Sequence, residues 1–258
     1  MRVVLPMAGL GRRLQQEGDV TPKMLRQIAG RPMLHWALDS LQGQVDVDHV
    51  IFVCLKQHLD RFPLEQTIRR YSRDARIIAL DHPTRGQAET VLAAAPHVPL
   101  DQPLMIYNCD TYLESRIGQT LARLSGLVDG VISVFPSQED CFSYVEVDDT
   151  GTVTRTTEKE VVSSYASTGL YHFSRARFFW EAAETAIAQG ERTAEEYYVA
   201  PLYNDLIAQG KHFVIDQADC CYPLGTPEQL EAFLPYAAAL STQQRGSGKD
   251  ERRGWRKR

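Results

Sequence analysis

A glycine-containing loop followed by basic residues is the first part of the sequence that could do chemistry. Gly9 and Gly11 follow the apolar run VVLPMA, and Arg13 and Lys23 come shortly after them. Glycine lets a backbone approach a ligand closely, while an arginine fork and a mobile ammonium group both pair with anionic oxygens. These residue types in this order indicate a site for a phosphate-bearing ligand.

The loop matches neither of two common phosphate-binding loops. A dinucleotide-binding fingerprint needs a third glycine three residues after the second, and Leu14 stands at that position. A P-loop needs a Lys-Ser or Lys-Thr pair, which this loop lacks. Taken alone, the loop is therefore either a simple turn with solvent-exposed Arg13 and Lys23, or a different cradle for a polyphosphate.

Further motifs, taken in order, resemble those of the sugar-1-phosphate nucleotidylyltransferases, also called nucleotide-sugar pyrophosphorylases. MAGLGRRL, TPKML and AGRPML are similar to the family's first signature, and the later matches are GQAET (86–90), NCD (108–110), EK (158–159), STGLYHF (167–173) and LGTPEQL (224–230). The resemblance implies transfer of a nucleoside monophosphate from CTP, UTP, GTP or dTTP to a phosphorylated acceptor, first of all a sugar 1-phosphate, with release of pyrophosphate. It also implies a Rossmann-like core and a product used in surface-polysaccharide or capsule biosynthesis.

The resemblance assigns a role to each matching residue. Nucleotide contacts fall on Ala8, Gly9, Gly11, Arg13, Gly86, Gln87 and Ala88. Acceptor contacts fall on Ser143, Glu158, Lys159, Thr168 and Gly169. Arg13, Lys23 and Lys159 are implied as catalytic residues that neutralise two reacting anions during in-line attack on the α-phosphorus, and Asp110 is implied as the ligand of a Mg²⁺ cofactor.

Four positions depart from the family's pattern near the expected substrates. Arg12 replaces the usual Thr or Ser before the loop arginine, and Glu160 replaces the proline that usually follows the E-K pair. Phe142-Ser143 stands where many relatives have Tyr-Gly beside the sugar. These changes alter the charge of the loop and the polarity of the acceptor pocket, so they leave the acceptor open.

A missing aspartate keeps several functions open. Pro223 stands where many relatives carry a second metal-binding aspartate, and Asp216 and Asp219 are candidate substitutes. The main alternative is a CTP-dependent cytidylyltransferase acting on a non-sugar phosphate of polyol, amino-acid or phosphonate type. A catalytically inactive nucleotide sensor is a second alternative. A glycosyltransferase is a third, because NCD is similar to a D-x-D metal motif, but it leaves Arg13 and Lys23 without a role.

The composition is that of a soluble globular protein. The 258 residues include 43% hydrophobic and 24% charged residues, and the net charge is −5. No apolar run is long enough for a membrane span and no signal peptide is apparent, so we expect a cytoplasmic protein. Five cysteines without a C-x-x-C pair predict reduced thiols. Residues 241–258 form a basic, polar segment that we expect to be disordered, and no nucleic-acid partner is expected.

Alternating strands and helices must position these residues. Strands are expected at 2–9, 49–55, 75–82, 103–113 and 130–137, separated by helices at 31–43, 58–72, 87–95 and 115–125. This pattern predicts a Rossmann-like, mainly parallel sheet flanked by helices. A hairpin at 143–159, strands at 167–174 and 211–217, and helices at 175–189, 193–209 and 226–240 predict a small, partly antiparallel substrate-binding lobe.

These elements predict one nucleotidyltransferase domain over residues 1–240. Its nucleotide-binding half covers about 1–135 and its acceptor-binding half about 136–240. Thr226, followed by Pro227, is expected to cap the last helix. The helices expected at 175–209 are a candidate interface for a homodimer, which the sequence does not decide.

Overall fold

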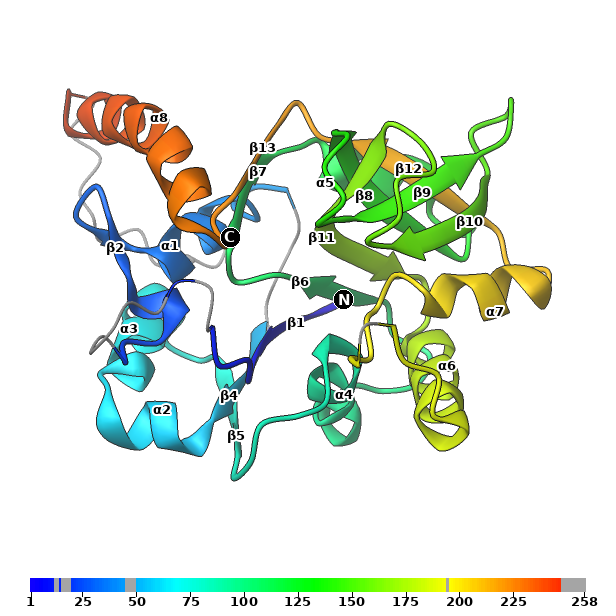
Figure 1. The fold of residues 1–258 in the computed structure, drawn as a ribbon, viewed down its shortest axis with the longest axis horizontal. Coiled ribbons are helices and arrows are strands. Elements are labelled where there is room, and N and C mark those ends of the chain that lie inside the picture. Colours follow the sequence, from blue (N-terminus) through cyan, green and yellow to red (C-terminus); the bar gives the residue numbers. More distant parts are fainter. Residues whose placement is uncertain (12–13, 15–19, 45–49, 194, 247–258) are drawn as a thin grey trace.

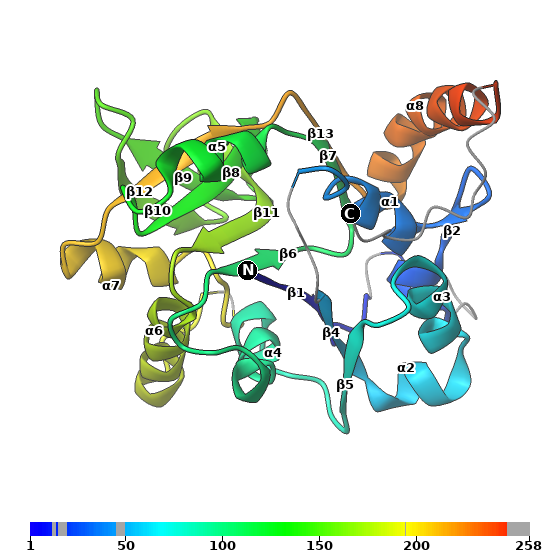
Figure 2. The ribbon, with the colours of Figure 1, turned by 180° about the vertical axis from the view of Figure 1, so that it is seen from behind.

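One nine-stranded sheet runs through the protein, with helices packed on both of its faces (Figures 1 and 2). The computed structural model describes residues 1–11, 14, 20–44, 50–193 and 195–246. The predicted fold class, a Rossmann-like and mainly parallel sheet flanked by helices, is confirmed. No helix in this described part of the chain is both long and apolar enough to cross a lipid bilayer.

The strands of the first half form a parallel block. Strand β1 (Arg2–Met7) lies between β4 (Val50–Leu55) and β6 (Leu104–Tyr107), and β5 (Arg76–Leu80) continues the block beyond β4. Most residues of β1, β4 and β6 are buried, as their continuous apolar runs predict for strands covered on both faces. The residues that follow these strands therefore meet at the carboxyl edge of one sheet.

The antiparallel strands of the second half extend the same sheet. Strand β11 (Tyr165–Phe173) runs antiparallel to β8 (Gly130–Pro136) on one side. On its other side it runs antiparallel to β9 (Ser143–Val147) near its start, at Ala166, and to β6 from Leu170 to Phe173. The predicted hairpin is formed by β9 and β10 (Val153–Glu158), while β12 (Phe213–Gln217) lies parallel to β8. The expected acceptor-side strands are thus continuous with the parallel block rather than separated from it.

Alternate side chains of the central strands enter two different cores. On β1, Val3 and Leu5 pack on one face and Val4 packs on the other, as the two-residue period of a strand requires. The first face is covered by α1 (Met33–Asp39), α3 (Leu64–Tyr71) and α5 (Ile117–Leu124). The second is covered by α4 (Gln87–Leu92), α6 (Ala176–Gln189) and α7 (Leu202–Ala208).

Three expected elements differ from the structure. The helix expected at 58–72 is two helices, α2 (Lys56–Arg61) and α3, because Pro63 interrupts the pattern. The strand expected at 103–113 breaks into β6 and β7 (Thr111–Glu114), and the Tyr107 hydroxyl donates to the carbonyl oxygen of Thr111 across the break (2.6 Å). The helix expected at 193–209 is wrong over its first half, because only α7 is helical there.

The last helix, α8 (Pro227–Gly246), begins with a capping box. The Thr226 hydroxyl accepts a hydrogen bond from the Gln229 backbone N–H (3.3 Å), and the Gln229 side chain accepts one from the Thr226 N–H (3.1 Å). The expected cap is therefore confirmed. The helix continues beyond residue 240, so residues 241–246 are helical, contrary to the expected disorder, while 247–258 lie outside the described residues.

A third apolar cluster attaches α8 to the rest of the protein. Phe233 packs edge-on against Trp36 (ring centroids 5.3 Å apart) and also contacts Tyr112 (5.2 Å). Strand β13 (Cys220–Pro223) pairs antiparallel with β7 and leads into the helix. Two short strands, β2 (Gln27–Ile28) and β3 (Arg31–Pro32), and the 3-10 helices at Lys23–Leu25 and Ala95–His97 complete the described elements.

All five cysteines are unpaired, in agreement with the expected thiols. Cys54 and Cys109 are buried, whereas Cys141 is exposed. Burial raises the pKa of the Cys109 thiol to about 12, and the neighbouring Asp110 carboxylate acts in the same direction, so the thiol stays protonated although Lys23 is nearby.

A buried histidine should make the fold sensitive to mild acid. Burial on β11 lowers the pKa of His172 from 6.5 to about 4. The unfolded chain therefore binds the proton more tightly, and the stability that neutral His172 provides is complete above about pH 6.5 and is lost as the pH falls toward 4. We expect the free energy of unfolding to drop by about 2–3 kcal/mol more in the wild type than in His172→Leu between about pH 7 and pH 4.5, measured by urea titration. The exposed residue His82 is the control, and an equal drop in His172→Leu and His82→Leu would contradict the prediction.

Candidate active site

A pocket of about 210 Å³ lies where the turn after β6 meets β11, the β9–β10 hairpin and the segment before α8. It brings together residues that are far apart in the sequence. Seven of the residues expected to be functional line it: Gln87, Asp110, Ser143, Glu158, Lys159, Thr168 and Gly169. The other expected residues with described positions, Ala8, Gly9, Gly11, Lys23, Gly86 and Ala88, are not among its lining residues.

Lys23 reaches the pocket through an ion pair with Asp110. Its Nζ lies 2.7 Å from Oδ2 of Asp110, and both side chains are only about one-fifth exposed, at 24% and 19%. The glycine loop packs against the same lysine, since a Cβ on Gly11 would lie 3.3 Å from the Cβ of Lys23, and Gly11 has a positive φ of 64°. The loop and the NCD motif are therefore neighbours in space, although Arg12 and Arg13 lie outside the described residues.

The LGT motif packs on the other side of Asp110. The Leu224 N–H donates to the carbonyl oxygen of Asp110 (2.8 Å), and a Cβ on Gly225 would lie 3.5 Å from Oδ2. Pro223 lies opposite Thr111 in the pairing of β13 with β7. The position that the family's second aspartate would take thus borders the pocket but carries no carboxylate.

Neither candidate for the missing metal ligand lies at Asp110. The Asp216 carboxylate accepts hydrogen bonds from Ser115 (2.7 Å) and Thr120 (2.6 Å), which hold it near the start of α5. Asp219 pairs with Arg116 (3.3 Å) at the end of β13 farther from Pro223. Within the described residues, no three His, Cys, Asp or Glu side chains gather as a metal site.

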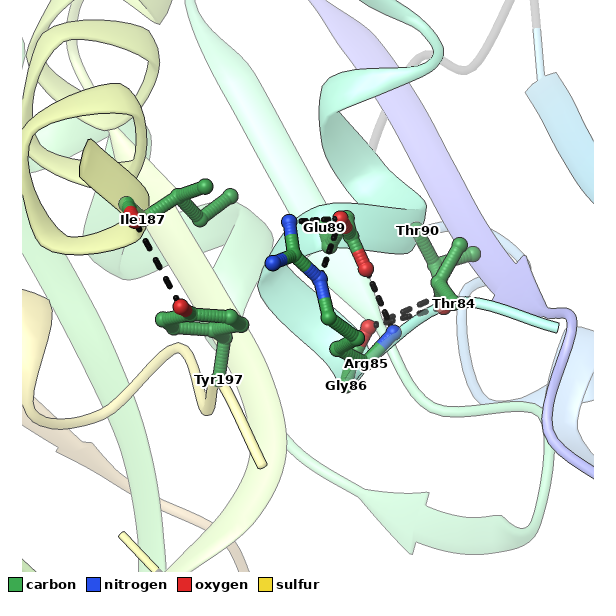
Figure 3. A network of polar contacts seen from close by, with 7 residues as sticks. All are labelled: Thr84, Arg85, Gly86, Glu89, Thr90, Ile187 and Tyr197. Carbon is green, nitrogen blue, oxygen red and sulfur yellow. Dashed lines mark hydrogen bonds and ion pairs between the residues drawn. The ribbon is translucent and has the colours of Figure 1, made fainter. Parts of the chain in front are cut away.

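The GQA segment is held in place by the loop before α7. Gly86 has a φ of 143°, and a Cβ there would lie 2.4 Å from the backbone nitrogen of Tyr197. Tyr197 also bonds through its backbone to Arg85 and Ala88, at 2.9 Å each. Figure 3 shows Arg85 folded onto Glu89 (2.6 Å) and Thr84 beside Thr90 (2.5 Å), so the start of α4 is fixed from both sides.

Gln87 points from this segment into the pocket. Its side-chain amide donates to Oδ1 of Asn108 (2.5 Å). Asn108 in turn contacts Gly169, whose φ is 81° and where a Cβ would lie 2.2 Å from the Asn108 amide nitrogen. Glycine at 169 therefore lets β11 pass close to the NCD turn. Thr168 is buried, and its hydroxyl donates to the carbonyl oxygen of Ser133 (3.3 Å).

The side of the pocket next to the β9–β10 hairpin carries one carboxylate, Glu158, and one ammonium group, Lys159. The Ser143 hydroxyl donates to Glu158 across the β9–β10 hairpin. Lys159 has a positive φ of 57°, and its backbone N–H donates to the carbonyl oxygen of Phe142 (2.9 Å). Its Nζ donates to the Tyr198 hydroxyl (2.7 Å). Glu158 and Lys159, which the sequence predicts at the end of a hairpin, thus line the pocket and are not simply an exposed pair of charged residues.

Several pocket residues were not expected to be functional. Tyr198, Asn108 and Gln229 line the pocket, and so does Phe135, whose ring packs edge-on against Phe142 (5.2 Å). Asn108 and Gln229 lie inside the motifs NCD and LGTPEQL, so their place in these motifs is a sequence signal for both. Nothing in the sequence near Tyr198 points to a ligand, because its position depends on the long-range contact with Lys159.

Residues 3–194 match the model of the MobA-like NTP transferase domain. The chain belongs to this family. Its predicted kinship with the sugar-1-phosphate nucleotidylyltransferases is confirmed.

Two solved structures share the fold of this NTP transferase. A nucleoside-diphosphate-sugar pyrophosphorylase from Vibrio cholerae RC9 is 27% identical, with a TM-score of 0.78, over 90% of this chain and 99% of that one. An inositol-1-phosphate CTP transferase from T. maritima is 13% identical, with a TM-score of 0.72, over 92% and 94% of the two chains. The latter likeness is one of fold.

One curated relative of the NTP transferase is longer than this chain. The bifunctional protein GlmU of Aliarcobacter butzleri (strain RM4018) is 25% identical over 220 residues, which is 81% of this chain. The matched part is 46% of the length of that protein, so the chain spans about half of its relative.

The close approach at Gly86 predicts an unusually costly substitution. Gly86→Ala adds a Cβ that overlaps the Tyr197 backbone and also places Ala at a positive φ. We expect it to lower the free energy of unfolding by about 3 kcal/mol or more, whereas Gly151→Ala, with a positive φ but open space around it, should cost about 1–2 kcal/mol. Urea unfolding of both variants measures the difference, and equal losses would show that the contact with Tyr197 has no energetic weight.

Proposed function

We propose that the chain transfers a nucleoside monophosphate from an NTP to a sugar 1-phosphate, giving a nucleotide sugar for surface-polysaccharide biosynthesis and releasing pyrophosphate. The observation that carries the proposal is the convergence on one pocket of the Asp110–Lys23 ion pair, from the nucleotide half, and Glu158–Lys159, from the acceptor half. A site for joining two phosphates needs cationic groups on both sides.

Each side chain has a role that follows from its position. A phosphate oxygen of the acceptor attacks the α-phosphorus, a new P–O bond forms, and the bond to pyrophosphate breaks, so no protein nucleophile is needed. Lys23 and Arg13 would neutralise the triphosphate, and Lys159 would bind the acceptor phosphate. Glu158 would accept hydrogen bonds from the rest of the acceptor. Ala8, Gly9, Gly11 and the GQA segment would contact the nucleotide, with Ser143, Thr168 and Gly169 beside the acceptor.

Mg²⁺ fits this proposal through Asp110. The ion prefers oxygen ligands and is commonly held by one or two carboxylates together with substrate phosphates and water. Asp110 provides one carboxylate beside the lysine that would bind phosphate, so its other ligands would be substrate oxygens and water. When bound, the ion would neutralise the negative charge of the triphosphate.

A CTP-dependent cytidylyltransferase acting on a non-sugar phosphate is the second candidate. The packed rings of Phe135 and Phe142 give the acceptor side an apolar wall, and the bond to Ser143 occupies part of the Glu158 carboxylate. Among these acceptors, such a wall favours the amino-acid and phosphonate types, which carry fewer hydroxyl groups than a hexose or a polyol. The fold does not decide between the two acceptor classes, because the inositol-1-phosphate CTP transferase shares it.

Pyrophosphate release measures the proposed function directly. We expect release with Mg²⁺ and one NTP among CTP, UTP, GTP and dTTP, across a panel of sugar 1-phosphates, polyol phosphates, amino-acid phosphates and phosphonates. The acceptor that turns over distinguishes the two candidates. NTP binding without turnover of any acceptor would indicate a nucleotide sensor, and sugar transfer without pyrophosphate release would indicate a glycosyltransferase.

Lys23→Ala should reduce kcat by about 10²–10³, because the lysine would stabilise charge that develops on the phosphates. The fold should be kept, because both side chains of the Lys23–Asp110 pair retain contact with solvent, so the remaining carboxylate can be hydrated. Lys56→Ala, which removes an exposed lysine paired with Asp60, is the matched control and should have wild-type activity. Near-normal turnover by Lys23→Ala would remove Lys23 from the mechanism.

Asp110→Asn should abolish most of the Mg²⁺-dependent activity, because a neutral amide oxygen binds Mg²⁺ much more weakly than a carboxylate does. The change keeps the shape of the side chain, so unfolding by urea should be close to that of the wild type. A Mg²⁺ titration of the rate measures the effect. Full activity at the wild-type Mg²⁺ concentration would refute the role of Asp110.

A further inference from the structure

The hydroxyl group of Tyr198 points to the pocket, and its proton has no hydrogen-bond acceptor among the described residues. The side chain is half-buried and lines the pocket. Its oxygen accepts a hydrogen bond from Nζ of Lys159 (2.7 Å), and the same ammonium lies 4.9 Å from the centre of the ring. A phenol can accept and donate at the same time, so this contact uses the oxygen and leaves the O–H available as a donor.

The state of the hydroxyl is fixed by its surroundings. Burial raises the pKa of Tyr198, and this outweighs the opposite effect of Lys159. The phenol therefore keeps its proton at neutral pH. An ammonium group that donates to the oxygen also polarises the O–H bond, which makes the hydroxyl a stronger donor to an anion.

Both members of the pair are held by rigid backbone. Tyr197, the residue before Tyr198, is buried, and its backbone is bonded to Arg85 and Ala88 at the start of α4. Lys159 is held in a left-handed conformation by the bond from its N–H to Phe142. Two fixed segments thus bring two donors to one place in the pocket, and the donors are oriented before a ligand binds.

We propose that Tyr198 and Lys159 form a two-donor clamp for the phosphate group of the acceptor. Tyr198 donates its hydroxyl proton to one phosphate oxygen, and Lys159 donates one of its remaining N–H bonds to the same group while it keeps its bond to Tyr198. The ligand class is a phosphate monoester or phosphonate. Identifying that ligand as the acceptor rests on the proposed function, whereas the clamp itself rests on the geometry of the pair.

Tyr198→Phe tests the clamp because it keeps the ring and removes only the hydroxyl. We expect the acceptor KM to rise by about tenfold, the size of one lost hydrogen bond to a charged group, while the KM for the NTP stays within about twofold. Tyr165→Phe is the control, because Tyr165 lies on β11 outside the pocket lining, and its KM values should match the wild type. An unchanged acceptor KM in Tyr198→Phe, or equal losses for both substrates, would overturn the clamp.

Binding of inorganic phosphate separates the clamp from the proposed function. Isothermal titration should show that Tyr198→Phe and Lys159→Gln each bind inorganic phosphate more weakly than the wild type does. The variant Lys23→Ala is measured beside them, because a loss of affinity in it would show that phosphate binds at the other end of the pocket. If both clamp variants lose affinity while no acceptor turns over, the clamp stands and the proposed function fails. If the wild type binds no phosphate, or if only Lys23→Ala weakens binding, the clamp is wrong.

Discussion

The turn Asn108–Asp110, directly after β6, is the constraint on which the pocket depends, because four separate segments contact it. Gln87 bonds to the Asn108 side chain, and Gly169 passes close to the same amide. Lys23 forms an ion pair with Asp110, and Leu224 bonds to its carbonyl oxygen. The strand could not continue through this turn without displacing all four segments. The separation of β6 from β7 is thus what creates the site.

The two lysines of the site differ in how their charge is balanced. Lys23 lies against a carboxylate, so the pair has little net charge, whereas Lys159 lies against a neutral phenol and keeps its charge in the pocket. The Glu158 carboxylate, which is bonded to Ser143, lines the same part of the pocket and offsets some of that charge. An anion that binds near Lys159 therefore meets an ammonium group whose own hydrogen-bond partner is uncharged, whereas an anion near Lys23 meets an ion pair.

Much of the fold follows from local patterns in the sequence. The apolar runs at β1, β4 and β6 predict buried parallel strands, and the box at Thr226–Gln229 predicts the start of α8. What could not be predicted depends on distant partners. The segment at 195–201 contains helix formers such as Glu195, Glu196 and Ala200, but the tight fit of Tyr197 on Gly86 holds it in another conformation. The role of Tyr198 could not be predicted for the same reason, since Lys159 is 39 residues away in the sequence. The motifs did predict which segments would gather at the pocket, because each carries a residue type suited to close approach or to phosphate.

The position of Leu224 and Gly225 against Asp110 has a consequence for biosynthesis. A ribosome releases the glycine loop and the NCD turn early, but the segment that completes their surroundings comes more than one hundred residues later. The parallel block can therefore begin to fold on a nascent chain that still lacks one wall of its pocket. A chain cut by a protease before α8 would lose both that wall and the aromatic anchor at Phe233. Such fragments would expose the aromatic side chains of Trp36 and Tyr112, and this exposed apolar surface would make them substrates for quality-control proteases.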